Sequence, residues 1–513
     1  MLGTKDKNFK THTTVSLEDL VPEDNLYRQV EECLDLRFVR DLVHGLYSPI
    51  GRPSIDPVVF FKLQLIAFFE GIRSERKLME TVNLNLAHRW YIGYDLDESV
   101  PDHSSLSKIR KRYGLETFQR FFENIVELCI ESGLVWGEEL FIDATKVKAN
   151  ASGRSVVDRT DEVLEHIQEL FDSDEGPRQN GDDYSIESGV DLIAKYNGER
   201  ITGSRTPSYK RIADKQISLT DPDAAPMRQS GSGRTVLGYR DHYIVDGGKA
   251  RIILSALVTP ASIMDNTPML DMVNWTCAKW NLSPSTVTAD AKYGTAPNIA
   301  GLEKAGIKAF VPIPDISKRT GLYHSDQFQY NREENHYICP QGQILKLHAR
   351  RRGEQVISYR ALAQVCNACP VKHECTRSKS GRQIFRSFHQ EFIERVKGYH
   401  ETNEYQKSMR KRGVWVEPLF GEAKQFHQLT RFRLRPLKKV NIEGLIVAAG
   451  QNIKRLLKYG LNRVVFALNQ RISAIEMCIL WNIHGARLNS DWLVPRVFQQ
   501  AETMCDVSKD ITQ

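Results

Sequence analysis

The stretch ELFIDATKV, residues 139–147, is composed like a buried strand, yet it contains Asp143. Short runs rich in apolar and β-branched residues predict strands. An unpaired carboxylate inside such a strand costs several kcal/mol. Asp143 therefore requires a partner, a metal ion or a function, and the rest of the chain has to supply it.

The segments after residue 138 predict a mixed α/β core. Further strand-like runs follow the first one, and helical patterns separate the later runs. These runs are GYRDHYIVD (238–246), RIILSALVTP (251–260), STVTAD (285–290) and AGIKAFVPIP (305–314).

The first 135 residues have a helical texture instead. SIDPVVFFKLQLIAFFEG (54–71) predicts a helix with Ser54 as its cap and Pro57 in its first turn. A second helical pattern begins after Asp102, and polar turns separate the segments. We expect a small helical bundle in which a helix-turn-helix would fit. Helical patterns return after residue 390, most clearly at 440–460.

Length and composition exclude several classes. A chain of 513 residues is too long for one compact core, so several domains are expected. The most apolar stretch, 57–72, is interrupted by Lys62, Gln64 and Glu70, which indicates a buried helix and no membrane span. The N-terminal segment lacks the apolar run of a signal peptide. We therefore expect a cytoplasmic protein without a disulfide framework.

Two further carboxylates are candidates for the site of Asp143. Asp290 ends the run 285–290, and open α/β sheets place their sites at the carboxyl ends of strands. Glu417 lies seven residues before Lys424, so both would face one way on a helix. Pro418 leaves two alternatives: either the helix begins there with Glu417 at its N-terminus, or a longer helix is kinked there. The first alternative would remove Arg410 from the face of Glu417.

The segments FIDATKVKAN, TADAKYG and VEPLFGEAK, around these three acids, resemble the catalytic motifs of DDE transposases of bacterial insertion sequences. The most similar type has a helical N-terminal domain before a ribonuclease H-like core. ISLTDPDA (217–224) and GYRDHYIVD resemble other stretches of that family. The resemblance runs from about residue 50 to about 460, and three motifs in the expected order are far more specific than any one alone.

The resemblance implies a metal-dependent site. It assigns the metal-binding acids to Asp143, Asp290 and Glu417, with Asp143 bridging two Mg²⁺ or Mn²⁺ ions, and it assigns a DNA phosphate contact to Lys424. Hard oxygen ligands suit such ions, and two of them stabilise the attacking and leaving oxygens of an in-line displacement. The family also has a tyrosine and an arginine before the glutamate, for which Tyr405 and Arg410 or Arg412 remain open.

The implied function is that of a transposase that binds terminal inverted repeats, cleaves strand ends and joins them to target DNA. Pairing two ends implies a homodimer on double-stranded DNA, and a bacterial origin implies a cytoplasmic, nucleoid-associated enzyme with no membrane contact. The alternative is a catalytically silent DNA-binding regulator descended from such an enzyme. Retention of all three acids favours the enzyme.

Each acid also has a structural interpretation when it is taken alone. Asp143 could be a hydrogen-bonded aspartate in a strand, and Asp290 could cap the helix after it. Glu417 and Lys424 could form a solvated pair, which contributes little to stability. Only the combination of all three favours catalysis.

Four of the nine cysteines lie within 37 residues and include a C-x₂-C pair. They predict a structural Cys₄ zinc site, with His373 as a spare ligand, and the resemblance implies a similar cluster. The alternative is a set of reduced thiols in a small hydrophobic patch. The four are Cys339, Cys366, Cys369 and Cys375.

Two basic clusters predict DNA contacts. Between residues 410 and 439, nine lysines and arginines stand against two acids. A second cluster lies in the N-terminal helical region, and for either one the alternative is an ordinary solvated face. The predicted contacts are Arg410, Arg412, Arg431, Arg433 and Arg435, with Lys108, Arg110, Lys111 and Arg112.

The sequence thus predicts an α+β or α/β protein with a ribonuclease H-like mixed sheet, a helical N-terminal domain and a cysteine-rich insertion. The predicted divisions are a DNA-binding domain at 1–135, a core at 136–320 with an exposed insertion at 172–190, a cysteine-rich insertion at 321–385, the rest of the core at 386–465 and a helical tail at 466–513.

Overall fold

A computed structural model describes the chain at residues 14–48, 50, 53–158, 160, 162–163, 188–198, 216–229, 233–313 and 321–484. The chain divides into two compact units after Lys458. Most of the predicted insertion at 172–190 and the end of the predicted tail lie outside the described residues. The finer domain divisions therefore stay predictions.

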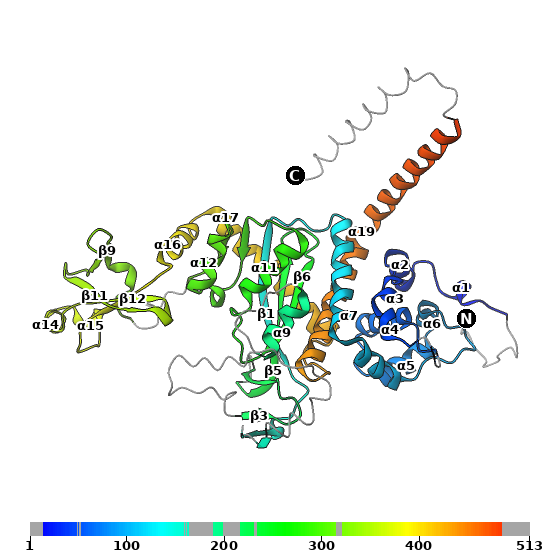
Figure 1. Cartoon of the computed structure of the whole chain (residues 1–513), viewed down its shortest axis with the longest axis horizontal. Helices are drawn as coiled ribbons and strands as arrows, with labels where there is room; N and C mark the ends of the chain where they lie inside the picture. Colours follow the sequence, from blue (N-terminus) through cyan, green and yellow to red (C-terminus); the bar gives the residue numbers. More distant parts are fainter. Residues whose placement is uncertain are drawn as a thin grey trace, which may run out of the picture. The chain divides into compact units, whose positions relative to one another are not determined.

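The N-terminal region is helical, as predicted (Figure 1). Asp56 caps the first long apolar helix, α4, by accepting a hydrogen bond from the backbone N–H of Val58, so the prediction of Ser54 as the cap was wrong. Pro57 occupies the first turn of α4, where its missing N–H costs nothing. The longer helices are α2 (Leu26–Cys33), α4 (Pro57–Phe69), α5 (Glu75–Leu84), α6 (Leu86–Ile92) and α7 (His103–Glu131); the shorter ones are α1 (Leu17–Leu20) and α3 (Phe38–Val43).

The main sheet is mixed, and β1 (Glu139–Lys148) runs through its middle (Figure 1). β1 pairs antiparallel with β5 (Thr235–Asp246) and parallel with β7 (Thr286–Thr288). β8 (Lys308–Phe310) continues the parallel side. β4 (Ala225–Arg228) and β6 (Ile253–Pro260) both pair antiparallel with β5. This mixed sheet with its helical N-terminal region confirms the predicted mixed α/β class, and its ribonuclease H-like character stays a prediction.

Helix α19 (Leu437–His484) covers the edge strand β6. The side-chain amide of Asn441 both accepts from the backbone N–H and donates to the carbonyl of Val258, and Asn452 does the same at Ile253. These four bonds satisfy edge groups of β6 that would otherwise lie buried without partners. The pattern at 440–460 predicted this helix, and its two asparagines fix where it docks.

A second sheet, of five strands in the order β13-β12-β11-β10-β9, lies within residues 321–388, which we call the cysteine-bearing module. Its core consists of six buried residues, among them Leu345, Tyr359 and Ile384. The bounds of its elements are β9 (Gln329–Asn331), β10 (His336–Ile338), β11 (Ile344–Arg351), β12 (Val356–Arg360), α14 (Ala363–Asn367), α15 (Lys372–Cys375) and β13 (Gln383–Ser387).

The helices between the strands complete the first unit. None of the described helices combines the length and apolar character needed to span a membrane. A small pair of strands, β2 (Val156–Asp158) and β3 (Gln216–Ser218), forms a separate ladder. The remaining helices are α9 (Gly189–Gly198), α11 (Met269–Trp280), α12 (Ala296–Lys304), α16 (Gln390–Tyr399), α17 (Asn403–Trp415) and α18 (Glu417–Phe426).

Candidate functional site

Asp143 lies on the central strand β1, where it pairs with Tyr243 of β5. The residues before it on β1 are fully buried, whereas the side chain of Asp143 is 14% exposed. Its Oδ1 accepts a hydrogen bond from the backbone N–H of Ala144 at 2.8 Å. The carboxylate thus lies where the strand emerges from the core, and it has one local donor.

Asp290 follows β7, the parallel neighbour of β1. Phe141 pairs with Thr288, so two residues further along each strand Asp143 and Asp290 reach the same level of the sheet. Asp290 also caps the short helical turn after β7 by accepting from the backbone N–H of Lys292 at 2.9 Å. Asp290 can therefore cap this turn and still lie beside Asp143.

Glu417 is the first residue of helix α18, and α17 ends two residues earlier at Trp415. The first alternative for Pro418 is thus correct: the helix begins at this point with Glu417 at its N-terminus. Contacts from α17 hold this junction over the sheet, because Lys411 forms an ion pair with Glu139 at the start of β1. The side chain of Glu417 is 59% exposed.

Arg412 connects two of the three acids. One guanidinium nitrogen donates to Asp143 Oδ2 at 3.0 Å, and the other lies 3.4 Å from Glu417 Oε1. Its Nε is buried and has no hydrogen-bond partner among the described residues. Arg410, two residues earlier, is exposed and bonds back to Gln406 of its own helix. Of the two arginines left open by the sequence, the one at the acids is Arg412.

The charges around Asp143 are not balanced. Burial raises the pKa of Asp143 to about 6 from its ordinary 3.8, and the charges of Asp290 and Glu417 add to the rise, whereas Arg412 opposes it. Burial also raises the pKa of Tyr293 strongly, with further contributions from Asp143 and Asp290. Asp290 and Glu417 are thus near enough to Asp143 for their negative charges to disfavour its ionisation.

Lys424 lies near this point on α18. Its Nζ donates to Thr145 Oγ1 at 2.5 Å, and Thr145 shares a strand face with Asp143 because the two are two residues apart on β1. Asp241 of β5 pairs with Thr145 and is fully buried, and neither of its carboxylate oxygens accepts a hydrogen bond from a described residue. Burial raises the pKa of Asp241 to about 8, and the nearby Lys424 opposes that rise.

The acids fit divalent cations by their chemistry, since carboxylate oxygens are the preferred ligands of Mg²⁺ and Mn²⁺. In the described parts of the chain, however, no group of three or more His, Cys, Asp or Glu side chains is arranged to hold a metal ion. Arg412 occupies the space between Asp143 and Glu417. The acids thus lie together with a protein cation between two of them.

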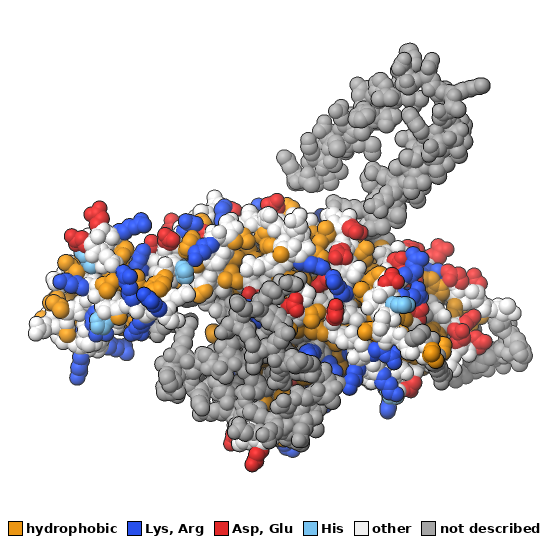
Figure 2. All heavy atoms as spheres, viewed as in Figure 1, with side chains coloured by type: hydrophobic (Ala, Val, Ile, Leu, Met, Phe, Trp, Pro, Cys, Tyr) orange, Lys and Arg blue, Asp and Glu red, His pale blue; other side chains and the backbone are white. Residues whose placement is uncertain are grey.

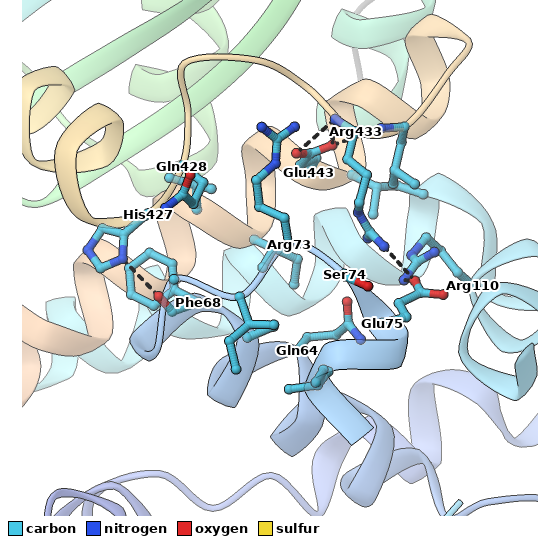
Figure 3. Close-up of a pocket in the computed structure, with 18 residues that line it drawn as sticks. Gln64, Phe68, Arg73, Ser74, Glu75, Arg110, His427, Gln428, Arg433 and Glu443 are labelled. Atoms are coloured by element: carbon cyan, nitrogen blue, oxygen red, sulfur yellow. Dashed lines mark hydrogen bonds and ion pairs between the residues drawn. The ribbon is translucent and has the colours of Figure 1, made fainter. Parts of the chain in front are cut away.

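Two of the predicted DNA contacts are engaged inside the protein. Arg110 is buried against Glu75, and Arg433 donates to the same carboxylate at 2.8 Å (Figure 3). Glu443 accepts from the backbone N–H groups of Arg433 and Leu434. Arg110 therefore does not fit the predicted role of a DNA contact, because its guanidinium does not face solvent.

The other predicted DNA contacts, apart from Arg412, are exposed. Arg112 lies over the ring of Tyr47 on the N-terminal helices. Arg431 and Arg435 also bond to backbone carbonyls, those of Ala149 and Thr220. The exposed members are Lys108, Lys111, Arg112, Arg410, Arg431 and Arg435.

The four cysteines of the module line one small pocket. The backbone N–H groups of Gln343 and Arg382 donate to the sulfurs of Cys339 and Cys366. Burial raises the pKa of the Cys375 thiol, and the three other thiols contribute to that rise. The four sulfurs therefore belong to one site, although they are not arranged as a metal cage.

Sequence reasoning missed three residues around the acids. Tyr293 stands three residues after Asp290 in the quoted motif TADAKYG, and its buried hydroxyl has no described partner. Thr145 and Asp241 face each other across β1 and β5 beside Lys424. Only Tyr293 carried a sequence signal, since the pairing of Thr145 with Asp241 depends on strand register.

Comparisons with known families agree with this arrangement. The family model described as "Transposase domain (DUF772)" matches residues 15–112, and "Transposase DDE domain" matches residues 338–457. The second match includes Arg412, Glu417 and Lys424. Both matching models are transposase models, one over the N-terminal helices and one over the part of the chain that contains Glu417.

Among curated proteins, no relative matches the chain. One solved structure that matches is described as a cryo-EM structure of the piggyBac transposase synaptic complex with hairpin DNA. It has 9% sequence identity and a TM-score of 0.30, and the match covers 85% of this chain and 73% of that one.

Proposed function

We propose that the chain cleaves DNA strand ends at Asp143, Asp290 and Glu417 and transfers them to target DNA. The observation that carries this proposal is that Arg412 links Asp143 and Glu417 in a partly buried place, where burial raises the pKa of Asp143 and the charges of Asp290 and Glu417 add to the rise. A cluster built only for stability would balance its charges. Two Mg²⁺ or Mn²⁺ ions would restore the balance and supply the stabilisation that phosphodiester cleavage requires.

The chain's own groups would then have separate tasks. Asp143, on the central strand β1, would hold the ions together with Asp290 and Glu417. Arg412 would have to leave the space between Asp143 and Glu417, and its guanidinium would then be available to a DNA phosphate. Lys424, beside Thr145 on the same strand face, would contact a phosphate near the cut.

The exposed basic residues would position the DNA. Lys108, Lys111 and Arg112 would contact phosphates near the transposon ends, and Arg410, Arg431 and Arg435 would do so closer to the acids. Joining two ends requires two active sites, so a homodimer on the terminal inverted repeats is expected. We propose on the same grounds that the protein is bacterial and is associated with the nucleoid.

The direct test is cleavage of a duplex that carries the terminal repeats, with Mn²⁺ or Mg²⁺. Asp143→Ala, Asp290→Ala and Glu417→Ala should each abolish cleavage while the melting temperature and the circular dichroism spectrum remain those of a folded protein. Lys407→Ala, an exposed cation of the neighbouring helix α17 that is not among the proposed contacts, is the matched control and should keep most activity. A near-normal rate from any of the three alanine variants would remove that residue from the site.

A catalytically silent DNA-binding regulator is the second candidate function. The observation in its favour is that no described group is arranged to hold a metal ion. Isothermal titration with Mn²⁺ in the presence of repeat DNA separates the two candidates. Binding of about two ions that is lost in Asp143→Ala supports the enzyme, whereas no binding together with no cleavage supports the regulator.

We also propose that Cys339, Cys366, Cys369 and Cys375 hold one structural Zn²⁺. Four thiolates would complete the coordination and leave no open position for chemistry. Their shared pocket and the two N–H···S bonds support this ligand set. Metal analysis should give about one zinc per chain, with a loss in Cys369→Ser and none in Cys277→Ser. A content well below one equivalent in the unmodified chain would overturn the assignment.

A further inference from the structure

The cysteine-bearing module concentrates positive charge. Between residues 344 and 388, ten lysines and arginines stand against two acids, Glu354 and Glu374, while the whole chain has 70 basic against 64 acidic residues. No Asp or Glu occurs from residue 335 to residue 353. A segment with so little compensating charge produces a positive potential that attracts a polyanion.

Strand register places part of this charge on one face of the sheet. Lys346 pairs with Arg360, and Ser358 pairs with Phe385. Residues directly opposite each other on paired strands share a face of the sheet, and every second residue along a regular strand returns to that face. By the pairing of β11 with β12, Arg351 lies on the same face as Lys346 and Arg360. The buried residues Leu345, Tyr359 and Ile384 lie on the opposite face. We call the group Lys346, Arg351, Arg360 and Phe385 the outward face of the module.

The outward face is accessible to a large partner. Lys346 and Arg351 are exposed, and the ring of Phe385 is 50% exposed. The guanidinium of Arg351 lies 5.3 Å from the centre of the Phe385 ring, a contact that orients it. Figure 2 shows lysine and arginine side chains gathered over this part of the chain, at the left of the view.

We propose that the outward face of the module binds the phosphate backbone of duplex DNA, as a contact separate from the three acids and from the basic clusters beside them. The occupant is argued from charge complementarity: three cations on one face of a sheet can meet successive phosphates of a duplex. The single aromatic ring among them favours a backbone contact over base stacking along a single strand. This inference rests on the proposed function only in taking duplex DNA as the polymer.

The test compares two double variants of the full chain with equal loss of charge. Lys346→Ala with Arg351→Ala removes two cations of the outward face. Lys249→Ala with Lys304→Ala removes two exposed cations elsewhere and is the matched control. Binding of a 30-base-pair duplex of arbitrary sequence is followed by fluorescence anisotropy over a range of salt concentrations, without divalent metal.

Each lost phosphate contact lowers the slope of log affinity against log salt by about 0.9. The outward-face variant should therefore lose about 1.8 from that slope, and the control should keep the slope of the unmodified chain. Equal slopes for the two variants would overturn the proposal. A selective loss of affinity for single-stranded RNA or for an acidic protein, with duplex binding intact, would overturn it in favour of that partner.

The experiment separates this proposal from the proposed function because binding without divalent metal does not depend on the three acids. Asp143→Ala should bind the duplex with the salt slope of the unmodified chain. A failure of the cleavage assay with a normal outward-face result would count against the enzyme alone. A normal cleavage assay with no change in slope would count against the outward face alone.

Discussion

Two clusters in this chain set arginines against carboxylates, and they differ in which charge is in excess. At the acids, Arg412 faces Asp143 and Glu417, with Asp290 beside them, and the pKa of Asp143 is raised to about 6. Between α5, α7 and the start of α19, Arg110 and Arg433 share Glu75. There burial would raise the pKa of Glu75, but the two arginines lower it overall.

The difference lies in the number of cations for each carboxylate, and under the proposed function it separates a cation-binding site from a structural cluster. Two arginines on one carboxylate leave no negative charge to neutralise, so the Glu75 cluster connects helices and does no more (Figure 3). At the three acids, Arg412 pairs with Asp143 and Glu417 and Lys292 lies 3.8 Å from Asp290, so two cations face three carboxylates. Charged residues also stand close together in the sequence around Glu75 and around Arg412. Only the elements packed around them decide which charge is in excess.

The largest expected effect is on cleavage. Asp143→Asn removes a charge that no neighbouring residue can replace, so cleavage of a repeat-bearing duplex should fall to the uncatalysed background. Glu75→Gln is the matched change in the other cluster and should leave the rate per folded molecule unchanged. A gel assay of strand cleavage, normalised to the folded fraction of each variant, measures both rates. Loss of cleavage in a folded Glu75→Gln protein would show that the two clusters are coupled.

The next effect is on stability. Glu75→Ala leaves Arg110 buried without a partner, which should cost about 3–5 kcal/mol in the free energy of unfolding. The exposed pair of Arg37 and Asp35 is the control, and Asp35→Ala should cost less than about 1 kcal/mol. Urea denaturation followed by tryptophan fluorescence measures both. Equal costs would mean that the Glu75 cluster is not structural.

The third effect is a pH-dependent stabilisation of the metal-free protein. The pKa of Asp143 is raised in the folded state, so ionisation of Asp143 destabilises the fold. This contribution to the free energy of unfolding is most favourable near pH 4 and is lost as the pH rises through about 6. Asp143→Asn should therefore stabilise the chelator-treated protein by about 2–3 kcal/mol at pH 8 and by almost nothing at pH 4. Thermal melts at both pH values check this.

Glu75→Gln should show the reverse pH dependence. The lowered pKa of Glu75 supplies stability that is present above its ordinary value near 4.5 and is lost as the pH falls below it. The penalty of the substitution should thus shrink on acidification. A stabilisation by Asp143→Asn that did not change with pH would contradict the interpretation of both sites.

The smallest expected effect is on metal affinity. Arg412→Gln removes the cation that competes for Asp143 and Glu417, so Mn²⁺ should bind the DNA-free protein about tenfold more tightly, or about 1.4 kcal/mol. Arg410→Gln, two residues away on the same helix, is the control and should leave the affinity as it is. Isothermal titration measures both. A weaker affinity in Arg412→Gln would mean that the arginine supports the metal site instead of occupying it.

Some of the site could be predicted because its signals are local. The strand pattern around Asp143 and the strand that ends before Asp290 marked two carboxylates at strand ends. Pro418 limited the helix of Glu417 to two alternatives, since proline restricts the backbone of the residue before it. The cysteine spacing likewise indicated a shared site, and the four thiols do line one pocket.

Other features could not be predicted because they depend on residues far away in the chain. Arg110 and Lys111 are adjacent in sequence, yet the first is buried against Glu75 and the second is exposed. Arg410 and Arg412 were equal candidates until the ends of α17 and α18 set their directions. The position of Asp241 beside Lys424 could not be predicted, because it requires both the pairing of β1 with β5 and the docking of α18.

The sequence by itself determined the mixed α/β class and the helical N-terminal region, because periodicity is written in neighbouring residues, and it predicted the three acids from motif order. Tertiary structure alone decided which charges meet: Arg412 with Asp143 and Glu417, and Arg110 and Arg433 with Glu75. The physical reason is that the effect of a charge depends on its burial and on its nearest opposite charge. Both are properties of elements brought together from distant parts of the chain.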